Sequence, residues 1–146
     1  MFHELIKKYP ALDGCKGEIQ HAAEQWIACF QNGGKLLVCG NGGSCADSEH
    51  IVGELMKGFL KKRPLSHAQT LVMKQNCPSI PDKWLAQLQC GLPAVSLTSF
   101  SALNSAFCND ENPELVYAQA LMGLGKRGDT LLCISTSGNS KNVYAA

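Results

Sequence analysis

The chain has 146 residues, of which 45% are hydrophobic and 17% charged, and its formal net charge is +1. This composition excludes a disordered chain, and the nearly neutral charge gives no reason to expect a nucleic acid or an anionic membrane as a partner. No apolar run approaches the roughly 20 residues of a membrane helix, and the N-terminus lacks the hydrophobic region of a signal peptide. We therefore expect one cytoplasmic domain whose eight cysteines are reduced thiols, since none are spaced as CxxC.

The first part of the chain predicts a helix, a buried strand, a glycine-rich turn and a second helix. Apolar residues recur at steps of three and four through residues 17–31, which indicates an amphipathic helix. The apolar run at 35–39 predicts a buried strand, and the sequence from Gly40 to Ser44 predicts a turn. A helix over about 44–59 follows, because Ser44 and Asp47 form the S-x-x-D pattern of an N-terminal cap.

Residues 60–93 interrupt this alternation. The segment opens with two lysines, an arginine and a proline, contains further prolines, and has one short helical candidate near residues 82–89. We expect an excursion inserted into the domain, either a hairpin of helices or a lid.

The rest of the chain returns to alternating elements. The expected order is a strand at 94–98, a helix at 99–107, a polar loop at 109–113, a helix at 114–124 and a strand at 130–134. A turn of small residues at 135–140 precedes a helix that begins near residue 142. Strands that alternate with helices predict an α/β fold with a parallel sheet flanked by helices. Such sheets bind ligands at the carboxyl ends of their strands.

Three strands make a small parallel sheet. With a last helix that starts near residue 142, one apolar face of the strand at 130–134 would stay partly wet. We therefore expect residues 1–146 to be a single, C-terminally incomplete domain. We also expect the native chain to continue beyond Ala146, and this stretch alone to be catalytically inactive.

Two turns carry the chemistry of an anion site. Glycines at 40, 42 and 43 let backbone amides approach a bound group, and the helix that follows favours an anion at its N-terminus. The alternative is a tight turn with a serine cap and no ligand. The sequence is neither a P-loop nor a G-x-G-x-x-G dinucleotide motif. The turn at 135–140 adds four hydroxyls, and together the two turns could hold a phosphate and sugar hydroxyls.

His50 and Glu54 are four residues apart and lie on one face of the predicted helix. By helical rise, they lie roughly 9 to 15 Å beyond Ser44. This pair could bind a divalent metal, and the carboxylate could act as a general base. The alternative is a solvated pair on a helix surface.

These motifs resemble the sugar isomerase (SIS) domain family, and within it the phosphoheptose isomerases. The resemblance is carried by C-G-N-G-G-S at 39–44 with His50 and Glu54, by L-P-A-V-S-L-T at 92–98, by Asn109-Asp110, and by I-S-T-S-G-N-S at 134–140. It covers nearly the whole chain except residues 60–93. It implies a three-layer sandwich of the flavodoxin-like or Rossmann-like type.

The resemblance also implies an activity and a site. The activity is aldose–ketose isomerisation of sedoheptulose 7-phosphate to a manno-heptose 7-phosphate through an enediol, in a homotetramer. Glu54 would be the base, and His50 and Glu54 would be two ligands of one Zn²⁺. The remaining ligands, and a histidine that donates a proton, are expected beyond Ala146. The implied substrate contacts are Asn41, Gly42, Gly43, Ser44, Asn109, Asp110, Ser135, Thr136, Ser137 and Ser140.

Two features depart from the family pattern. The excursion at 60–93 is enlarged, and Cys45 replaces the small residue common beside the glycine turn. A second function also stays open, because some SIS proteins are non-catalytic assembly factors or sugar-phosphate sensors. Glu54 favours the enzyme, because an assembly factor of this kind has a non-acidic residue at that position.

Overall fold

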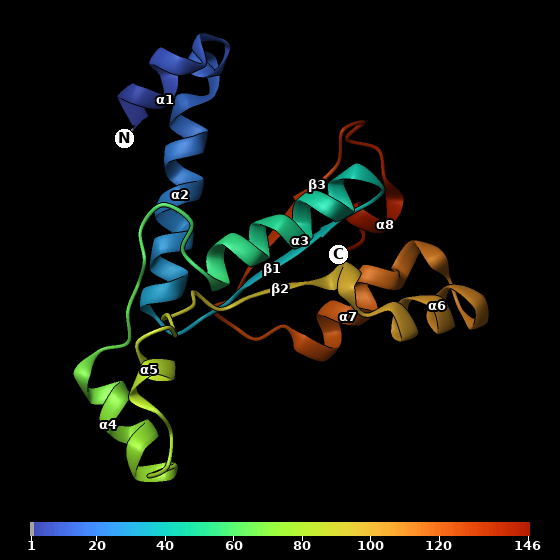
Figure 1. The fold of residues 1–146 in the computed structure, drawn as a ribbon. Coiled ribbons are helices and arrows are strands. Elements are labelled where there is room, and N and C mark those ends of the chain that lie inside the picture. The colour runs from blue at the N-terminus through green and yellow to red at the C-terminus, as the bar shows by residue number, and fades with distance from the viewer. Residues whose placement is uncertain (1) are drawn as a thin grey trace.

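The computed structural model describes residues 2–146 and contains a three-stranded parallel sheet between layers of helices (Figure 1). The strands are β1 (Leu36–Gly40), β2 (Ala94–Ser96) and β3 (Thr130–Ile134), in the order β2-β1-β3. The helices are α1 (Phe2–Lys8), α2 (Lys16–Gln31), α3 (Gly43–Met56), α4 (His67–Asn76), α5 (Asp82–Leu85), α6 (Ser101–Asp110), α7 (Val116–Leu124) and α8 (Lys141–Tyr144). Short 3-10 turns span Pro10–Cys15, Leu97–Ser99 and Pro113–Leu115. The predicted fold class is confirmed.

The two faces of the sheet bury alternate residues of β1. Leu37 and Cys39 pack with Val116 and Tyr117 of α7 and with Val143 of α8. Leu36 and Val38 face the opposite side, where α2 and α3 supply partly buried apolar side chains that include Trp26, Ile51 and Leu55. All five residues of β1 are buried, because both faces of a central parallel strand are covered.

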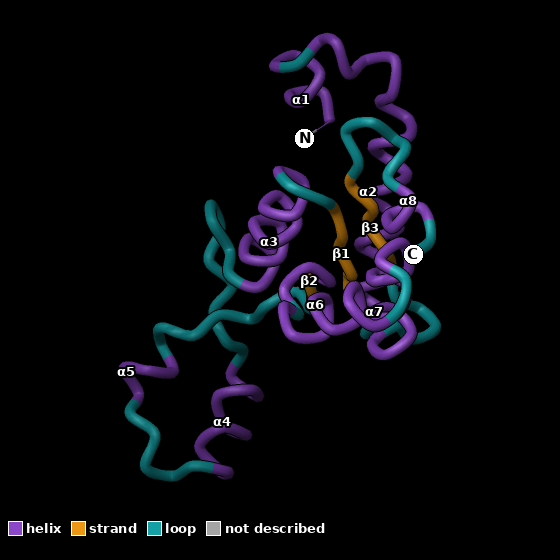
Figure 2. The backbone as a smooth tube through the Cα atoms, turned by 90° about the vertical axis from the view of Figure 1, so that its right-hand side faces the viewer, coloured by secondary structure: helices purple, strands orange, loops and turns teal. Residues whose placement is uncertain are grey.

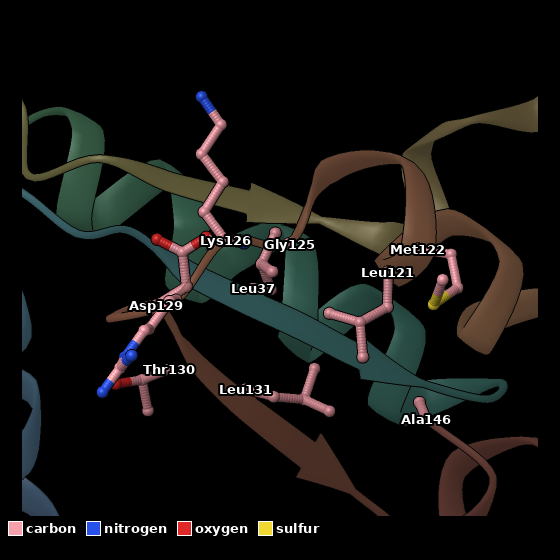
Figure 3. A pocket seen from close by; sticks show the side chains of 10 residues that line it. Leu37, Leu121, Met122, Gly125, Lys126, Asp129, Thr130, Leu131 and Ala146 are labelled. Carbon is pink, nitrogen blue, oxygen red and sulfur yellow. Dashed lines mark hydrogen bonds between the residues drawn. The ribbon is translucent and has the colours of Figure 1, made fainter.

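Strand β3 is less covered than β1. Its apolar side chains are only half-buried, and Cys133 is exposed. A hollow of about 470 Å³ beside α7 is lined by Leu37, Leu121, Leu131 and Ala146, with Asp129 at its rim (Figure 3). The expectation that this strand would be partly wet is confirmed, and the hollow contains none of the predicted site residues.

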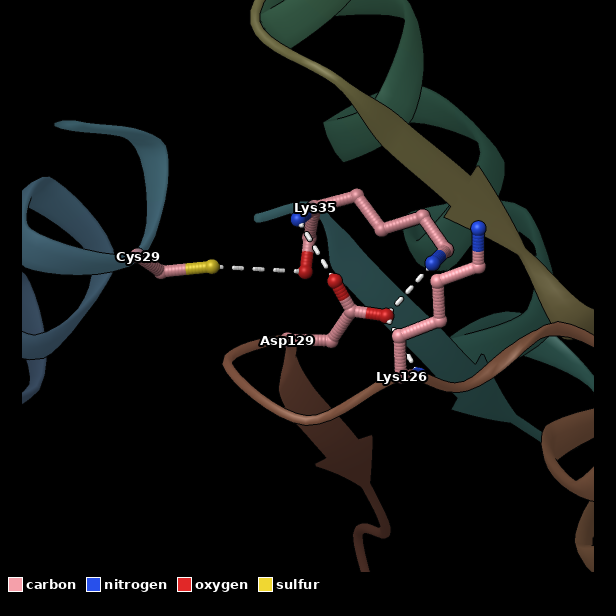
Figure 4. A network of polar contacts seen from close by, with 4 residues as sticks. All are labelled: Cys29, Lys35, Lys126 and Asp129. Atoms are coloured by element: carbon pink, nitrogen blue, oxygen red, sulfur yellow. Dashed lines mark hydrogen bonds and ion pairs between the residues drawn. The ribbon is translucent and has the colours of Figure 1, made fainter. Parts of the chain in front are cut away.

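One acidic side chain joins the amino ends of β1 and β3 (Figure 4). The carboxylate of Asp129 accepts hydrogen bonds from the backbone N–H of Lys35 at 2.9 Å and of Lys126 at 2.8 Å, and forms an ion pair with the Lys35 ammonium. Burial alone would raise the pKa of Asp129, but the hydrogen bonds and the charge of Lys35 together hold this pKa below its usual range. The carboxylate therefore fixes the start of both strands in its ionised form.

The excursion stands apart from the sheet in both views (Figures 1 and 2). It contains α4, which the sequence analysis missed, and α5, which is shorter than the predicted helix at 82–89. Arg63 closes its base: the guanidinium donates to the carbonyl of Cys90 at 2.8 Å and to that of Leu55, the penultimate residue of α3. The backbone of Arg63 also accepts from the N–H of Cys90 at 2.7 Å. The excursion therefore leaves and rejoins the domain at one point, as a hairpin of helices does.

Several boundaries differ from those predicted. The strand expected at 94–98 ends at Ser96, because Leu97–Ser99 form a 3-10 turn, and the helix expected at 99–107 begins at Ser101. The polar loop expected at 109–113 begins later, because Asn109 and Asp110 are the last residues of α6. The helix expected from residue 114 begins as a 3-10 turn at Pro113. The helix expected over 44–59 ends at Met56. None of the helices in the described part of the chain is both long and apolar enough to cross a bilayer.

Candidate functional site

The register of the sheet brings the two predicted turns side by side. Gly40 and Ile134 are paired at the carboxyl ends of parallel β1 and β3. The glycine turn (residues 41–43) and the serine turn (residues 135–140) therefore leave the same edge of the sheet. This confirms that both turns lie at the carboxyl edge of the sheet, which is where parallel sheets commonly bind ligands.

Two glycines shape the first turn. A side chain at Gly40 would place its Cβ 2.7 Å from the Cβ of Ser44 and 2.8 Å from its carbonyl oxygen, so the turn folds back onto the strand. Gly42 has a φ of +56° and is the N-cap of α3, a conformation that glycine adopts at little cost. The predicted cap by Ser44 is wrong, because the bend at Gly42 starts the helix earlier and leaves Ser44 inside its first turn.

The amides of this turn are partly engaged within the turn itself. Ser44 N–H donates to the carbonyl of Asn41 at 3.0 Å, and Cys45 N–H to that of Gly42 at 3.1 Å. Among the described residues, the N–H groups of Gly42 and Gly43 have no such acceptor. Ser44 is 8% exposed and lies beneath the turn. An anion at this edge would therefore meet the amides of Gly42 and Gly43 first.

The serine turn is organised by its own hydroxyls. Ser135 Oγ donates to Ser140 Oγ at 3.1 Å, and Ser137 Oγ accepts from the N–H of Asn139 at 3.2 Å. Thr136 and Ser137 are exposed, whereas Ser135 and Ser140 are half-buried. Lys141, the nearest cation, is paired with Glu114 at 2.7 Å, which raises the pKa of Lys141. The donors that this turn offers are therefore hydroxyls and amides.

Two side chains that the sequence analysis did not single out, Tyr117 of α7 and Asn142 of α8, hold Asn41 of the glycine turn. Asn41 and Asn142 exchange two hydrogen bonds through their side-chain amides, at 2.8 and 3.0 Å. The hydroxyl of Tyr117 lies 2.8 Å from the carbonyl oxygen of Gly40 and 2.9 Å from Asn41 Oδ1. Burial, with smaller contributions from neighbouring thiols, raises the pKa of Tyr117 to about 12, so the hydroxyl stays protonated. A tyrosine on a mostly apolar helix was the available signal, because a buried hydroxyl needs a partner.

A pair of thiols lies beneath the turns. Cys39 and Cys133 are register partners on β1 and β3, and their sulfur atoms are 3.7 Å apart. Burial, followed by the neighbouring Cys133, raises the pKa of Cys39 to about 12, so its thiol is protonated and is not a nucleophile at neutral pH. All eight cysteines are free thiols.

His50 and Glu54 lie on α3, beyond the glycine turn. His50 is exposed and Glu54 half-buried, and no hydrogen bond joins them in the part of the chain that the structure describes. No group of three or more His, Cys, Asp or Glu side chains among the described residues could hold a metal ion. The pair supplies two suitable donors, fewer than the three protein ligands of a catalytic zinc site.

Asn109 and Asp110 lie at the end of α6, where both are exposed. Asn109 Nδ2 donates to Asp110 Oδ1 at 2.7 Å, and within residues 2–146 no hydrogen bond joins either side chain to the two turns. The structure thus gathers the glycine and serine turns and places the Asn109–Asp110 pair outside that network.

A polar cluster missed by the sequence analysis faces α3 from the end of β2. Glu49 accepts from Ser99 Oγ at 3.3 Å and from Thr98 Oγ1 at 3.5 Å. These side chains come from the middle of α3 and from the turn after β2, so the carboxyl end of β2 is also polar.

Comparisons with known proteins agree with this geometry. The family model described as SIS domain matches residues 10–89, more than half of the chain. The phosphoheptose isomerase of Laribacter hongkongensis is 37% identical over 142 residues, which cover 97% of this chain and 59% of that protein. The phosphoheptose isomerase of Shewanella loihica is 33% identical and is covered to 60%.

Solved structures give the same picture. A phosphoheptose isomerase from Francisella tularensis has a TM-score of 0.66 at 28% identity, with 99% of this chain and 66% of that chain covered. The phosphoheptose isomerase from Neisseria gonorrhoeae has a TM-score of 0.61 at 30% identity, with 99% and 65% covered. This chain spans about 60% of the length of the curated relatives that it matches. With its glycine and serine turns at one edge of a parallel sheet, the chain belongs to the SIS domain family.

Proposed function

We propose that this protein is a phosphosugar aldose–ketose isomerase that converts sedoheptulose 7-phosphate to a manno-heptose 7-phosphate. The observation that carries the proposal is that the glycine and serine turns leave the carboxyl ends of paired strands β1 and β3, where Asn41 is hydrogen-bonded to Asn142 of α8, the helix that follows the serine turn. The names of the similar proteins, all phosphoheptose isomerases, support the choice of substrate.

In this proposal the turns bind the phosphate group. The free amides of Gly42 and Gly43 and the exposed hydroxyls of Thr136 and Ser137 are all donors, and phosphate oxygens are acceptors. The N-terminus of α3 adds its partial positive charge. Ser44 completes the phosphate site from below, and Asn109 and Asp110 stay proposed substrate contacts.

The reaction moves a proton between C1 and C2 of the sugar. A base removes the proton from C1 of the ketose as O2 gains a proton, which gives the enediol; O1 then loses its proton as C2 gains one, which gives the aldose. We propose Glu54 as the base, because it is half-buried and its carboxylate has no hydrogen bond to another described residue. Such a carboxylate is available to take up a proton.

Zinc enters the proposal only through His50 and Glu54, which would be two of its ligands. Further donors would have to come from outside the residues described here, since these residues provide no third ligand. When bound, zinc would polarise the sugar oxygens on which charge develops. We further propose a cytoplasmic homotetramer, which light scattering at micromolar concentration tests directly.

The test is an isomerase assay of the full-length native protein, in which NMR follows the conversion of sedoheptulose 7-phosphate. Glu54→Gln is expected to reduce turnover by about a hundredfold or more while sugar-phosphate binding persists. Glu18→Gln, at an exposed position of α2, is the matched control and should retain full turnover. Turnover by Glu54→Gln at the wild-type rate would exclude Glu54 as the base. Binding of sedoheptulose 7-phosphate by the wild-type protein without any turnover would instead favour a sugar-phosphate sensor or assembly factor.

A further inference from the structure

We infer that Tyr117 and Asn142 are positioning residues that hold Asn41, and with it the glycine turn, in the geometry that receives the substrate phosphate. The inference deepens the proposed function and rests on it. Neither residue is among the ten substrate contacts implied by the family resemblance.

The first step is the hydrogen-bonding capacity of Asn41. Its Oδ1 accepts from Asn142 Nδ2 at 3.0 Å and lies 2.9 Å from Tyr117 Oη, whose single proton it shares with the carbonyl oxygen of Gly40, so two partners occupy this oxygen. Its Nδ2 donates one of two hydrogens to Asn142 Oδ1 at 2.8 Å. Asn41 therefore offers a ligand one remaining N–H and no acceptor, which suits an oxygen of a phosphate or a sugar.

The second step is the origin of the two partners. Tyr117 is 7% exposed and belongs to the core cluster beneath the sheet, so its ring is fixed by packing. Asn142 lies on α8, two residues after Ser140, and α8 is tied to that serine because Val143 N–H donates to its carbonyl at 3.1 Å. The end of β1 is thus linked to both α7 and α8.

The third step is what this linkage does to the site. The amide pair sets the position of the glycine turn relative to the helix that follows the serine turn. Tyr117 also lies 2.8 Å from the carbonyl oxygen of Gly40, so its single hydroxyl proton is shared between the strand end and the turn. Without the hydroxyl of Tyr117, the glycine turn can shift away from the serine turn. Binding of phosphate must then also order the glycine turn, and this entropic cost weakens the affinity.

Tyr117→Phe tests this inference, because it keeps the buried ring and removes one hydroxyl. Calorimetry with sedoheptulose 7-phosphate and with inorganic phosphate should show a Kd about fivefold to tenfold higher than that of the wild type, the effect of about one lost hydrogen bond. Tyr144→Phe is the matched control, because that hydroxyl is on a side chain 92% exposed, and its Kd should be unchanged.

A second readout separates positioning from plain stability. In an Asn41→Ala background, Tyr117→Phe should change the Kd by less than twofold, because the side chain through which it acts is absent. A purely structural role would lower Tm equally in both backgrounds and leave both Kd values unchanged. Asn142→Ala tests the same inference through the other partner of Asn41, because it removes both hydrogen bonds of the amide pair, and it should raise the Kd by a similar factor.

Three outcomes are informative. The inference is supported if Tyr117→Phe and Asn142→Ala each raise the Kd, and if Tyr117→Phe changes it by less than twofold in the Asn41→Ala background. Wild-type affinity in both variants overturns it and leaves the proposed function intact. A wild-type protein that binds neither sedoheptulose 7-phosphate nor inorganic phosphate overturns the proposed function and the inference together.

Discussion

The clearest stability prediction concerns Asp129. Asp129→Asn keeps the size of the side chain but removes the charge that accepts from two backbone N–H groups and pairs with the Lys35 ammonium. In the variant only one side-chain oxygen can accept a hydrogen bond, and the new NH₂ group faces one of the backbone N–H donors, Lys35 or Lys126. Hydrogen bonds to charged groups contribute about 1.5–3 kcal/mol each, and the Asp129 side chain is only 9% exposed. We therefore expect a loss of about 2–4 kcal/mol in the free energy of unfolding.

A surface ion pair supplies the matched control. Lys74 and Asp82 are also in direct contact, but the Asp82 side chain is 82% exposed. Asp82→Asn should therefore cost no more than about 1 kcal/mol, as exposed pairs do. Urea denaturation at pH 7, followed by circular dichroism, measures both variants against the wild type. Equal destabilisation by the two substitutions would refute the argument that burial and the backbone N–H groups give Asp129 its effect.

The remaining predictions concern pH, the turns and the excursion. Because the pKa of Asp129 is lowered on folding, its stabilising effect is present above the unfolded pKa and is lost as pH falls through the folded pKa; acid titration should therefore destabilise the wild type more than Asp129→Asn. Gly40→Ala should lower stability by about 1–3 kcal/mol in a urea titration, because its Cβ would overlap Ser44, whereas Gly43→Ala, with nothing within 4 Å, should not. Ser44→Asp should abolish calorimetric binding of inorganic phosphate by repulsion, and unchanged affinity would contradict the placement of the phosphate. Arg63→Ala should speed proteolytic cleavage between residues 60 and 93, and cleavage no faster than in a Lys62→Ala control would argue against Arg63 as the closure of the excursion.

The strands were predictable because each is an apolar run between residues that end it. The run at 35–39 became Leu36–Gly40, and the strand at 130–134 was predicted with its observed bounds. Once parallel pairing is assumed, the meeting of the two turns follows from the strand ends alone. This part of the site therefore depends on local sequence and on a general rule of α/β sheets.

What the sequence did not predict depends on contacts between distant residues. Asn41 and Asn142 are 101 positions apart, and Tyr117 is 76 positions from Asn41. No local pattern shows that these side chains meet. The missed helix α4 is different, because Ser66 and Gln69 form a capping box, a local sequence pattern that predicts the start of a helix. The wrong cap at Ser44 shows the reverse error, in which a valid local pattern was displaced by the positive φ of Gly42.

The closed base of the excursion has a consequence for how this part of the gene can vary. Arg63 and Cys90 hold the two ends of the excursion together, and Leu92 N–H donates to the carbonyl of Leu55 at 2.9 Å. The position of the strands therefore does not depend on how many residues lie between Arg63 and Cys90. For a flexible loop, each doubling of length costs only about 0.6 kcal/mol in closure entropy. Insertions, deletions or a reporter peptide placed between α4 and α5 should therefore leave the two turns undisturbed, which makes this segment the natural place to label the protein.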